Sequence, residues 1–106
     1  MDFEDLASRL GVDKEDFVEL VELFITTSRS DMEKIRQGMQ GKNASDAASA
    51  AHSIKGAAGN LGFEQMADLA KTMEFEGKAG SLDGFDDYLT ELETHLKQLE
   101  KVLAEG

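Results

Sequence analysis

The 106-residue chain contains no cysteine and no proline. Without cysteine it cannot form disulfides or thiolate metal sites, so neither can hold the fold together. Without proline, glycine is the main residue that can interrupt a helix, which favours a few long helices joined by short connections. At this length the chain is large enough to bury one modest core and too short for two.

Positive charge is also scarce, because 11 Lys and Arg residues stand against 22 Asp and Glu, a formal net charge of -11. Nucleic acids and anionic membrane surfaces are bound by clusters of Lys and Arg, so the sequence predicts neither as a partner. No apolar run approaches the roughly 20 residues that a membrane-spanning helix needs. The first five residues, MDFED, lack the basic and apolar regions of a signal peptide, so we expect a cytoplasmic protein.

Apolar residues recur at steps of three and four along most of the chain, and no segment shows sustained period-two alternation. Start and stop residues such as Asn43 and Gly62 divide this pattern into segments. They predict a short lid helix over about 3–10 and bundle helices over about 13–40, 43–61, 63–78 and 84–104. We therefore predict a single all-α domain over residues 1–106, an antiparallel up-down-up-down four-helix bundle with a short N-terminal capping helix.

His52 lies off the apolar stripe of the predicted 43–61 helix. Besides Lys55, the positions three, four and seven residues away are all small, and we expect them to form a partner-binding surface: Ser45, Ala48, Ser49, Gly56 and Gly59. Each glycine inside a helix costs about 1 kcal/mol relative to alanine, so its presence should bring some gain. We expect that gain to be close access of another molecule to His52. The alternative is that both glycines pack closely within the bundle.

Lys55 follows His52 by one helical turn, where its ammonium can reach an anionic group carried on the imidazole. A histidine side chain is a good nucleophile near neutral pH because a useful fraction of it is uncharged. Together the two residues predict a histidine that accepts and releases a phosphoryl group, with Lys55 offsetting the added charge. Each also has a plainer interpretation, an ordinary surface histidine and a solvated lysine.

The run from His52 to Gly62, HSIKGAAGNLG, resembles the signature of histidine-containing phosphotransfer (HPt) domains, in which His-Ser/Thr-Leu/Ile-Lys-Gly opens the motif and Asn-Leu-Gly closes it. A looser similarity extends along the whole chain. The resemblance implies a phosphorelay intermediate, in which His52 accepts a phosphoryl group from a receiver phospho-aspartate or a histidine kinase and passes it to a receiver aspartate. It also implies no cofactor on this chain, with Mg²⁺ expected on the partner receiver domain.

In HPt domains a Gln or Glu on the next helix commonly hydrogen-bonds the second imidazole nitrogen, and the matching position here is Glu74. A carboxylate that accepts from Nδ1–H would leave Nε2 to attack phosphorus. The alternative for Glu74 is a solvated acid. Lys78 matches a position that is often basic in the family and is expected to assist Lys55. Phe75 lies off the core stripe, so we expect it in an apolar rim for docking.

Phe63 and Met66 could contribute to the same rim, although core packing is the role that we expect for both. His95 flanks the stripe of the last helix, and we interpret it as structural or solvated. Neither histidine is preceded at the third position by the Glu that a di-iron bundle site requires.

The glycine-rich run after Lys55 lacks the Gly-x-Gly start of a dinucleotide loop and the Gly-Lys-Ser/Thr of a P-loop. We therefore expect a phosphoryl carrier, not an autonomous ATP-using enzyme. One alternative is a helical adaptor that uses the same face without phosphorylation. Another is an excised phosphotransfer domain of a larger chemotaxis-type or hybrid kinase. Met1 and the capped final helix favour a free-standing protein, which we expect to be a monomer.

Overall fold

A computed structural model describes residues 2–105 of the chain. These residues form helices and no strand: α1 (Phe3–Leu10), α2 (Lys14–Gln40), α3 (Ala44–Leu61), α4 (Glu64–Lys78) and α5 (Phe85–Glu105). Every helix end lies within one residue of the end predicted from the sequence. Within the described residues, no helix combines the length and the apolar content needed to cross a bilayer.

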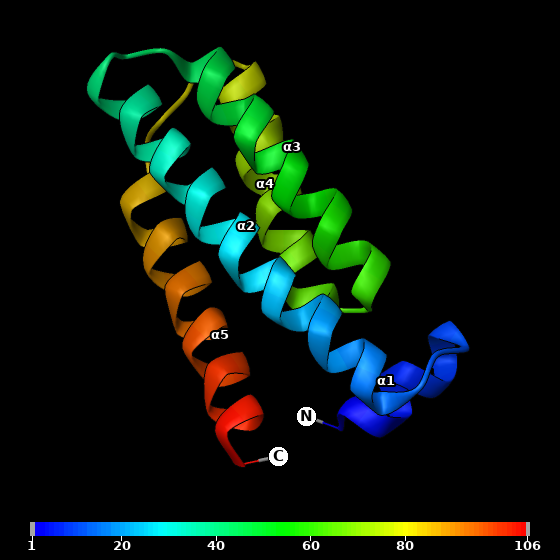
Figure 1. The fold of residues 1–106 in the computed structure, drawn as a ribbon. Coiled ribbons are helices and arrows are strands. Elements are labelled where there is room, and N and C mark those ends of the chain that lie inside the picture. The colour runs from blue at the N-terminus through cyan, green and yellow to red at the C-terminus, as the bar shows by residue number, and fades with distance from the viewer. Residues whose placement is uncertain (1, 106) are drawn as a thin grey trace.

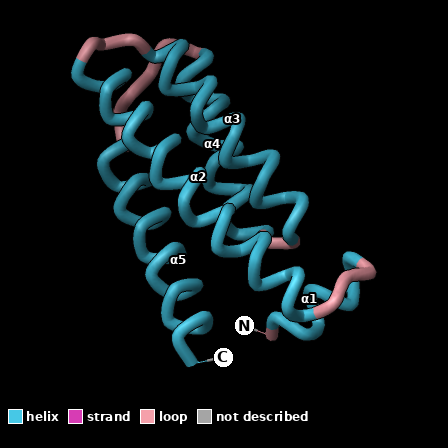
Figure 2. The backbone as a smooth tube through the Cα atoms, in the orientation of Figure 1, coloured by secondary structure: helices cyan, strands magenta, loops and turns pink. Residues whose placement is uncertain are grey.

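The four long helices run alternately up and down and form the bundle, and α1 lies across one end of it (Figure 1). The connections between successive helices are short, and the longest of them joins α4 to α5 (Figure 2). Each long helix packs against the helix before it, and α5 closes the bundle by packing on α2 as well as on α4. The predicted all-α bundle with a short N-terminal helix is confirmed.

Local capping explains where α3 begins and ends. The side chain of Asn43 accepts a hydrogen bond of 3.1 Å from the backbone N–H of Asp46, which satisfies one free donor of the first turn. At the other end Gly62 takes a left-handed conformation with φ of 84°, and its N–H is directed at the carbonyls of Ala58 and Gly59. The chain then reverses into α4.

Glycines on α2 and α4 let both helices approach the alanine-rich α3 closely. A Cβ atom added to Gly38 would lie 3.2 Å from Ala47 Cβ, and one added to Gly77 would lie 2.9 Å from Ala48 Cβ. Real Cβ atoms essentially never come as close as the second distance. Gly41 follows the last residue of α2, whereas Gly38 is buried inside the helix because α3 packs against it.

Large side chains fill the remaining volume of the core. Phe63 lies between Phe17 and Phe24, with ring centroids 6.2 and 5.3 Å away, and Phe3 of α1 contacts Phe17 at 5.5 Å. Phe63 and Met66 are both almost fully buried, so their expected place in the core is confirmed and neither forms a rim. The end of the bundle under α1 is therefore closed by aromatic packing.

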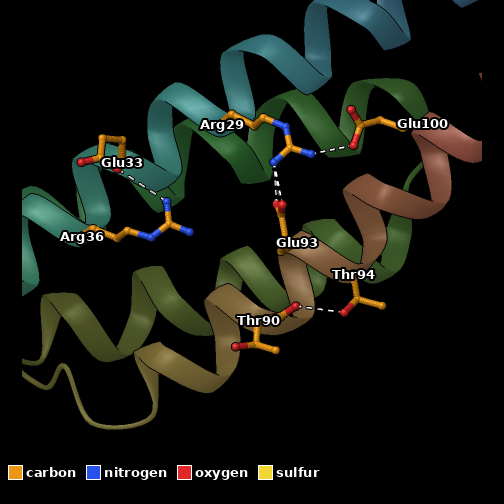
Figure 3. A network of polar contacts seen from close by, with 7 residues as sticks. All are labelled: Arg29, Glu33, Arg36, Thr90, Glu93, Thr94 and Glu100. Atoms are coloured by element: carbon orange, nitrogen blue, oxygen red, sulfur yellow. Dashed lines mark hydrogen bonds and ion pairs between the residues drawn. The ribbon is translucent and has the colours of Figure 1, made fainter.

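An arginine clamp fastens α5 to α2 on the face away from α3 (Figure 3). Nη1 of Arg29 donates to both carboxylate oxygens of Glu93 at 2.7 Å, and Nη2 donates to Glu100 at 2.6 Å. The two acceptors lie seven residues apart on one face of α5. One guanidinium therefore spans two turns of the neighbouring helix, which its planar fork of donors allows.

Candidate functional site

His52 lies near the middle of α3, and its side chain is 64% exposed. The buried stripe of the same helix includes Ala47, Ala51, Ile54 and Ala58, so the imidazole projects away from the core as predicted. A ring in this position can be reached by a second protein without any opening of the bundle.

Glu74 of α4 holds the imidazole in one orientation. Its Oε2 lies 2.7 Å from Nδ1 of His52, and the residue is 6% exposed, so the alternative of a solvated acid is wrong. The close contact between Gly77 and Ala48 explains how Glu74 reaches His52. It brings α4 so near to α3 that the side chain of Glu74, one turn before Gly77, contacts the imidazole.

This hydrogen bond fixes the tautomer of the neutral ring. An ionised carboxylate can only accept, so Nδ1 carries the hydrogen and the free lone pair lies on Nε2. No partner of Nε2 is found among residues 2–105. The nitrogen that is free to react is therefore the one directed away from Glu74.

Two lysines complete the surroundings of the Glu74 carboxylate. Nζ of Lys55 donates to Oε1 at 2.6 Å, and Nζ of Lys78 lies 3.1 Å from Oε2. The hydrogen bond from Lys55 is the largest influence on the pKa of Glu74, and with those from Lys78 and His52 it outweighs burial and lowers the pKa to about 2. Glu74 is thus ionised at every pH at which the protein is expected to work.

Both lysines have a partner in the Glu74 carboxylate, so the alternative of Lys55 as a solvated lysine is wrong. Lys55 was expected to face an anionic group on the imidazole, and Lys78 was expected to assist it. Both ammonium groups contact Glu74, and their expected roles toward a phosphoryl group stay predictions. The contact of Lys55 with Glu74 could not be predicted from local spacing, because it depends on the distance between α3 and α4, whereas Lys78 lies one turn from Glu74 on the same helix.

The outer face of α3 around His52 is smooth and open. Gly56 and Gly59 are exposed, and a Cβ atom added to either would have no neighbour within 4 Å, so the alternative that they pack within the bundle is wrong. Ser45 and Ser49 are exposed beside them. On α4, Phe75 presents a large apolar side chain that is 75% exposed.

Ala48 requires a correction, because we expected it on the open surface. It is only 2% exposed, since it packs against Gly77 of α4. It forms part of the floor of a shallow hollow whose other lining residues are Ser45, Ser49, His52, Glu74, Gly77 and Lys78. The role of Gly77 could not be predicted from the sequence, where its local context is a helical glycine three residues after Glu74.

Comparisons with known proteins agree with this geometry. The chain matches the family model of the Hpt domain over residues 19–102. It is similar to the crystal structure of histidine-containing phosphotransfer protein B (HptB) from Pseudomonas aeruginosa PAO1, with a TM-score of 0.84 and 22% sequence identity over 99% of this chain and 91% of that chain. That likeness shows a shared fold. A comparison with curated proteins gives no match.

The family match extends over well more than half of the chain and includes α3 and α4 entirely. Hpt proteins are phosphoryl carriers and not autonomous enzymes, and they interact with receiver domains and kinases. The chain belongs to the Hpt domain family and has a histidine phosphotransfer role in phosphorelay signalling.

Proposed function

We propose that His52 is the phosphoryl-accepting residue of this carrier. The observation that carries the proposal is the hydrogen bond of 2.7 Å between Glu74 and Nδ1, which leaves Nε2 on an imidazole that is largely exposed. His95, the other histidine, is partly buried and has neither a lysine partner nor a carboxylate partner within the described part of the chain.

In the proposed reaction, Nε2 attacks the phosphorus of an aspartyl phosphate on a receiver domain. The Nε2–P bond forms while the P–O bond to the aspartate breaks, and the aspartate carboxylate leaves with the electron pair. The ring keeps its Nδ1 proton and so gains positive charge, which the adjacent anionic Glu74 stabilises. Transfer to the aspartate of the next receiver reverses these changes.

The chain's own contribution is positioning, since it orients the nucleophile and presents it on an open face. We expect the receiver to supply the Mg²⁺ that neutralises charge on the transferring group. Ser45, Ser49, Gly56 and Gly59 would allow the receiver backbone to come close to the imidazole, and exposed Phe75 would provide an apolar contact at the edge. A histidine kinase is the other proposed donor. Cytoplasmic localisation and a monomeric state stay predictions.

Incubation with phosphorylated receivers tests the proposal. Wild-type protein should acquire phosphate that is labile in acid and stable in base, and His52→Gln should acquire none while keeping its helical circular dichroism spectrum. His95→Gln is the matched control and should be phosphorylated like the wild type. A protein that binds receivers but never carries phosphate would instead be the helical adaptor.

A further inference from the structure

The buried carboxylate of Glu74 has more cationic partners than its own charge requires. Its side chain is 8% exposed, and the ammonium groups of both Lys55 and Lys78 lie within 3.1 Å of its oxygens. A single cation is enough to pair one carboxylate, and ordinary surface pairs of this kind contribute little. The second lysine therefore calls for a physical reason.

The two oxygens of Glu74 are occupied differently. Oε1 is bound by Lys55 alone, whereas Oε2 is shared by Lys78 and by Nδ1 of His52. Departure of Lys55 would leave the hydrogen bond to the imidazole and the contact with Lys78 in place. Departure of Lys78 would disturb the oxygen that orients the ring.

Phosphorylation of His52 adds a second anion to this cluster, with close to two negative charges. Lys55 is the nearer cation along the chain, because it lies on α3 one turn from His52, whereas Lys78 lies on α4 one turn from Glu74. Two anions are then matched by two ammonium groups. Without the second lysine, the departure of Lys55 would leave the cationic ring as the one charged partner of the buried carboxylate within residues 2–105, and removing a partner from a buried charge is costly.

We propose that Lys55 is a mobile cation, which moves from Oε1 of Glu74 to the phosphoryl group on His52. Lys78 is then a positioning residue, which stays on Oε2 and keeps Glu74 paired and the ring oriented while Lys55 is engaged. The inference rests on the proposed function of His52. It differs from the expectation that Lys78 contacts the phosphoryl group, because here Lys78 acts through Glu74.

Chemical phosphorylation with phosphoramidate allows a test that needs no receiver. Nε2 forms the bond to phosphorus, the P–N bond of phosphoramidate breaks, and its nitrogen leaves as ammonia, while the ring keeps the proton on Nδ1. Thermal unfolding is then compared before and after phosphorylation for Lys78→Met and Lys71→Met. Lys71 is the matched control, an exposed lysine two turns earlier on α4 that is not among the cations contacting Glu74.

Phosphorylation should lower the Tm of Lys78→Met by about 4–8 °C more than it lowers the Tm of Lys71→Met, as expected for a pair worth about fivefold in an equilibrium constant. Before phosphorylation the two variants should unfold at similar temperatures, because Lys55 still pairs Glu74. If Lys78→Met lowers the Tm by the same amount before and after phosphorylation, Lys78 has a purely structural role and the inference is overturned.

The same comparison in a Glu74→Gln background separates action through Glu74 from direct contact with phosphate. The extra effect of Lys78→Met should vanish there, since a neutral amide needs no cation. Its persistence would mean that Lys78 touches the phosphoryl group, and the inference would be wrong. In wild type, the Nζ resonance of Lys55 should shift on phosphorylation far more than that of Lys78. Failure of His52 to carry any phosphate would instead remove the proposed function itself.

Discussion

Oε2 of Glu74 lies 2.7 Å from Nδ1 of His52, so a residue of α4 sets the tautomer of the nucleophile on α3. Glu74→Ala removes the acceptor, and we expect it to slow phosphoryl transfer by about 10–100-fold, by analogy with the loss of a group that orients a metal-binding histidine. Glu74→Gln keeps an acceptor without the charge and should slow transfer less. Single-turnover transfer from a phosphorylated receiver measures both rates. Equal loss in the two variants would show that charge alone matters.

The pKa of Glu74 makes a second prediction, for acid stability. Its hydrogen bond from Lys55, with those from Lys78 and His52, lowers the pKa from 4.5 to about 2. Because the pKa is lower in the folded protein, ionised Glu74 contributes its full stability above the unfolded value and loses it as pH falls through about 2.

Urea unfolding of wild type and Glu74→Gln over a pH series isolates this group, because the other acids titrate in both proteins. The difference in free energy of unfolding should be constant above about pH 5 and should shrink steadily below pH 4.5. A difference that does not change down to pH 2 would mean that the cluster does not stabilise the ionised carboxylate.

Helix bounds and the position of His52 could be predicted because their signals are local. Asn43 and Gly62 cap α3 through bonds to residues within four positions, and helical spacing alone places His52 off the buried stripe. Capping and periodicity depend on residues that are close in the sequence, so both can be predicted from a single sequence.

Contacts between helices could not be predicted in the same way. Ala48 and Gly77 lie 29 positions apart, and nothing in either helix alone shows that they meet. Their contact buries Ala48 and brings Glu74 to His52 and Lys55 on the other helix. The resemblance to HPt domains supplied the match between Glu74 and His52, but it did not supply the number of cations on that carboxylate.

The different surroundings of Gly56 and Gly77 predict opposite effects of the same substitution. Gly56→Ala should raise the free energy of unfolding by about 0.5–1 kcal/mol, because its Cβ meets nothing within 4 Å and alanine is the better helix former. Gly77→Ala should lower it by about 1–3 kcal/mol, because its Cβ would lie 2.9 Å from Ala48. Denaturant unfolding measures both, and two changes of the same sign would contradict the predicted packing.

A bulky residue at Gly56 tests whether the open face serves docking. Gly56→Phe should leave the Tm close to that of Gly56→Ala and weaken receiver binding by tenfold or more, about 1.4 kcal/mol, since the ring would stand where the partner approaches. Titration calorimetry with an unphosphorylated receiver gives the dissociation constants. Unchanged affinity would place the receiver elsewhere on the bundle.

The Arg29 clamp makes a last prediction, which concerns the fold and not the transfer site. Arg29→Met removes three short hydrogen bonds to Glu93 and Glu100, and we expect the free energy of unfolding to fall by about 1–2 kcal/mol, an effect reduced by solvent because the side chain is 39% exposed.

Arg36→Met is the matched control, because Arg36 lies two turns further along α2 and its one acidic partner within residues 2–105 is Glu33 of its own helix, at 3.6 Å (Figure 3). Arg36→Met should lower the free energy of unfolding by less than about 0.5 kcal/mol. The loss for Arg29→Lys should fall between those two losses, since a single ammonium nitrogen cannot replace the two guanidinium nitrogens that donate to Glu93 and Glu100. Urea unfolding ranks the three variants. Equal losses at Arg29 and Arg36 would mean that the connection between α2 and α5 depends on the buried leucines of α5 alone, with the clamp contributing nothing measurable.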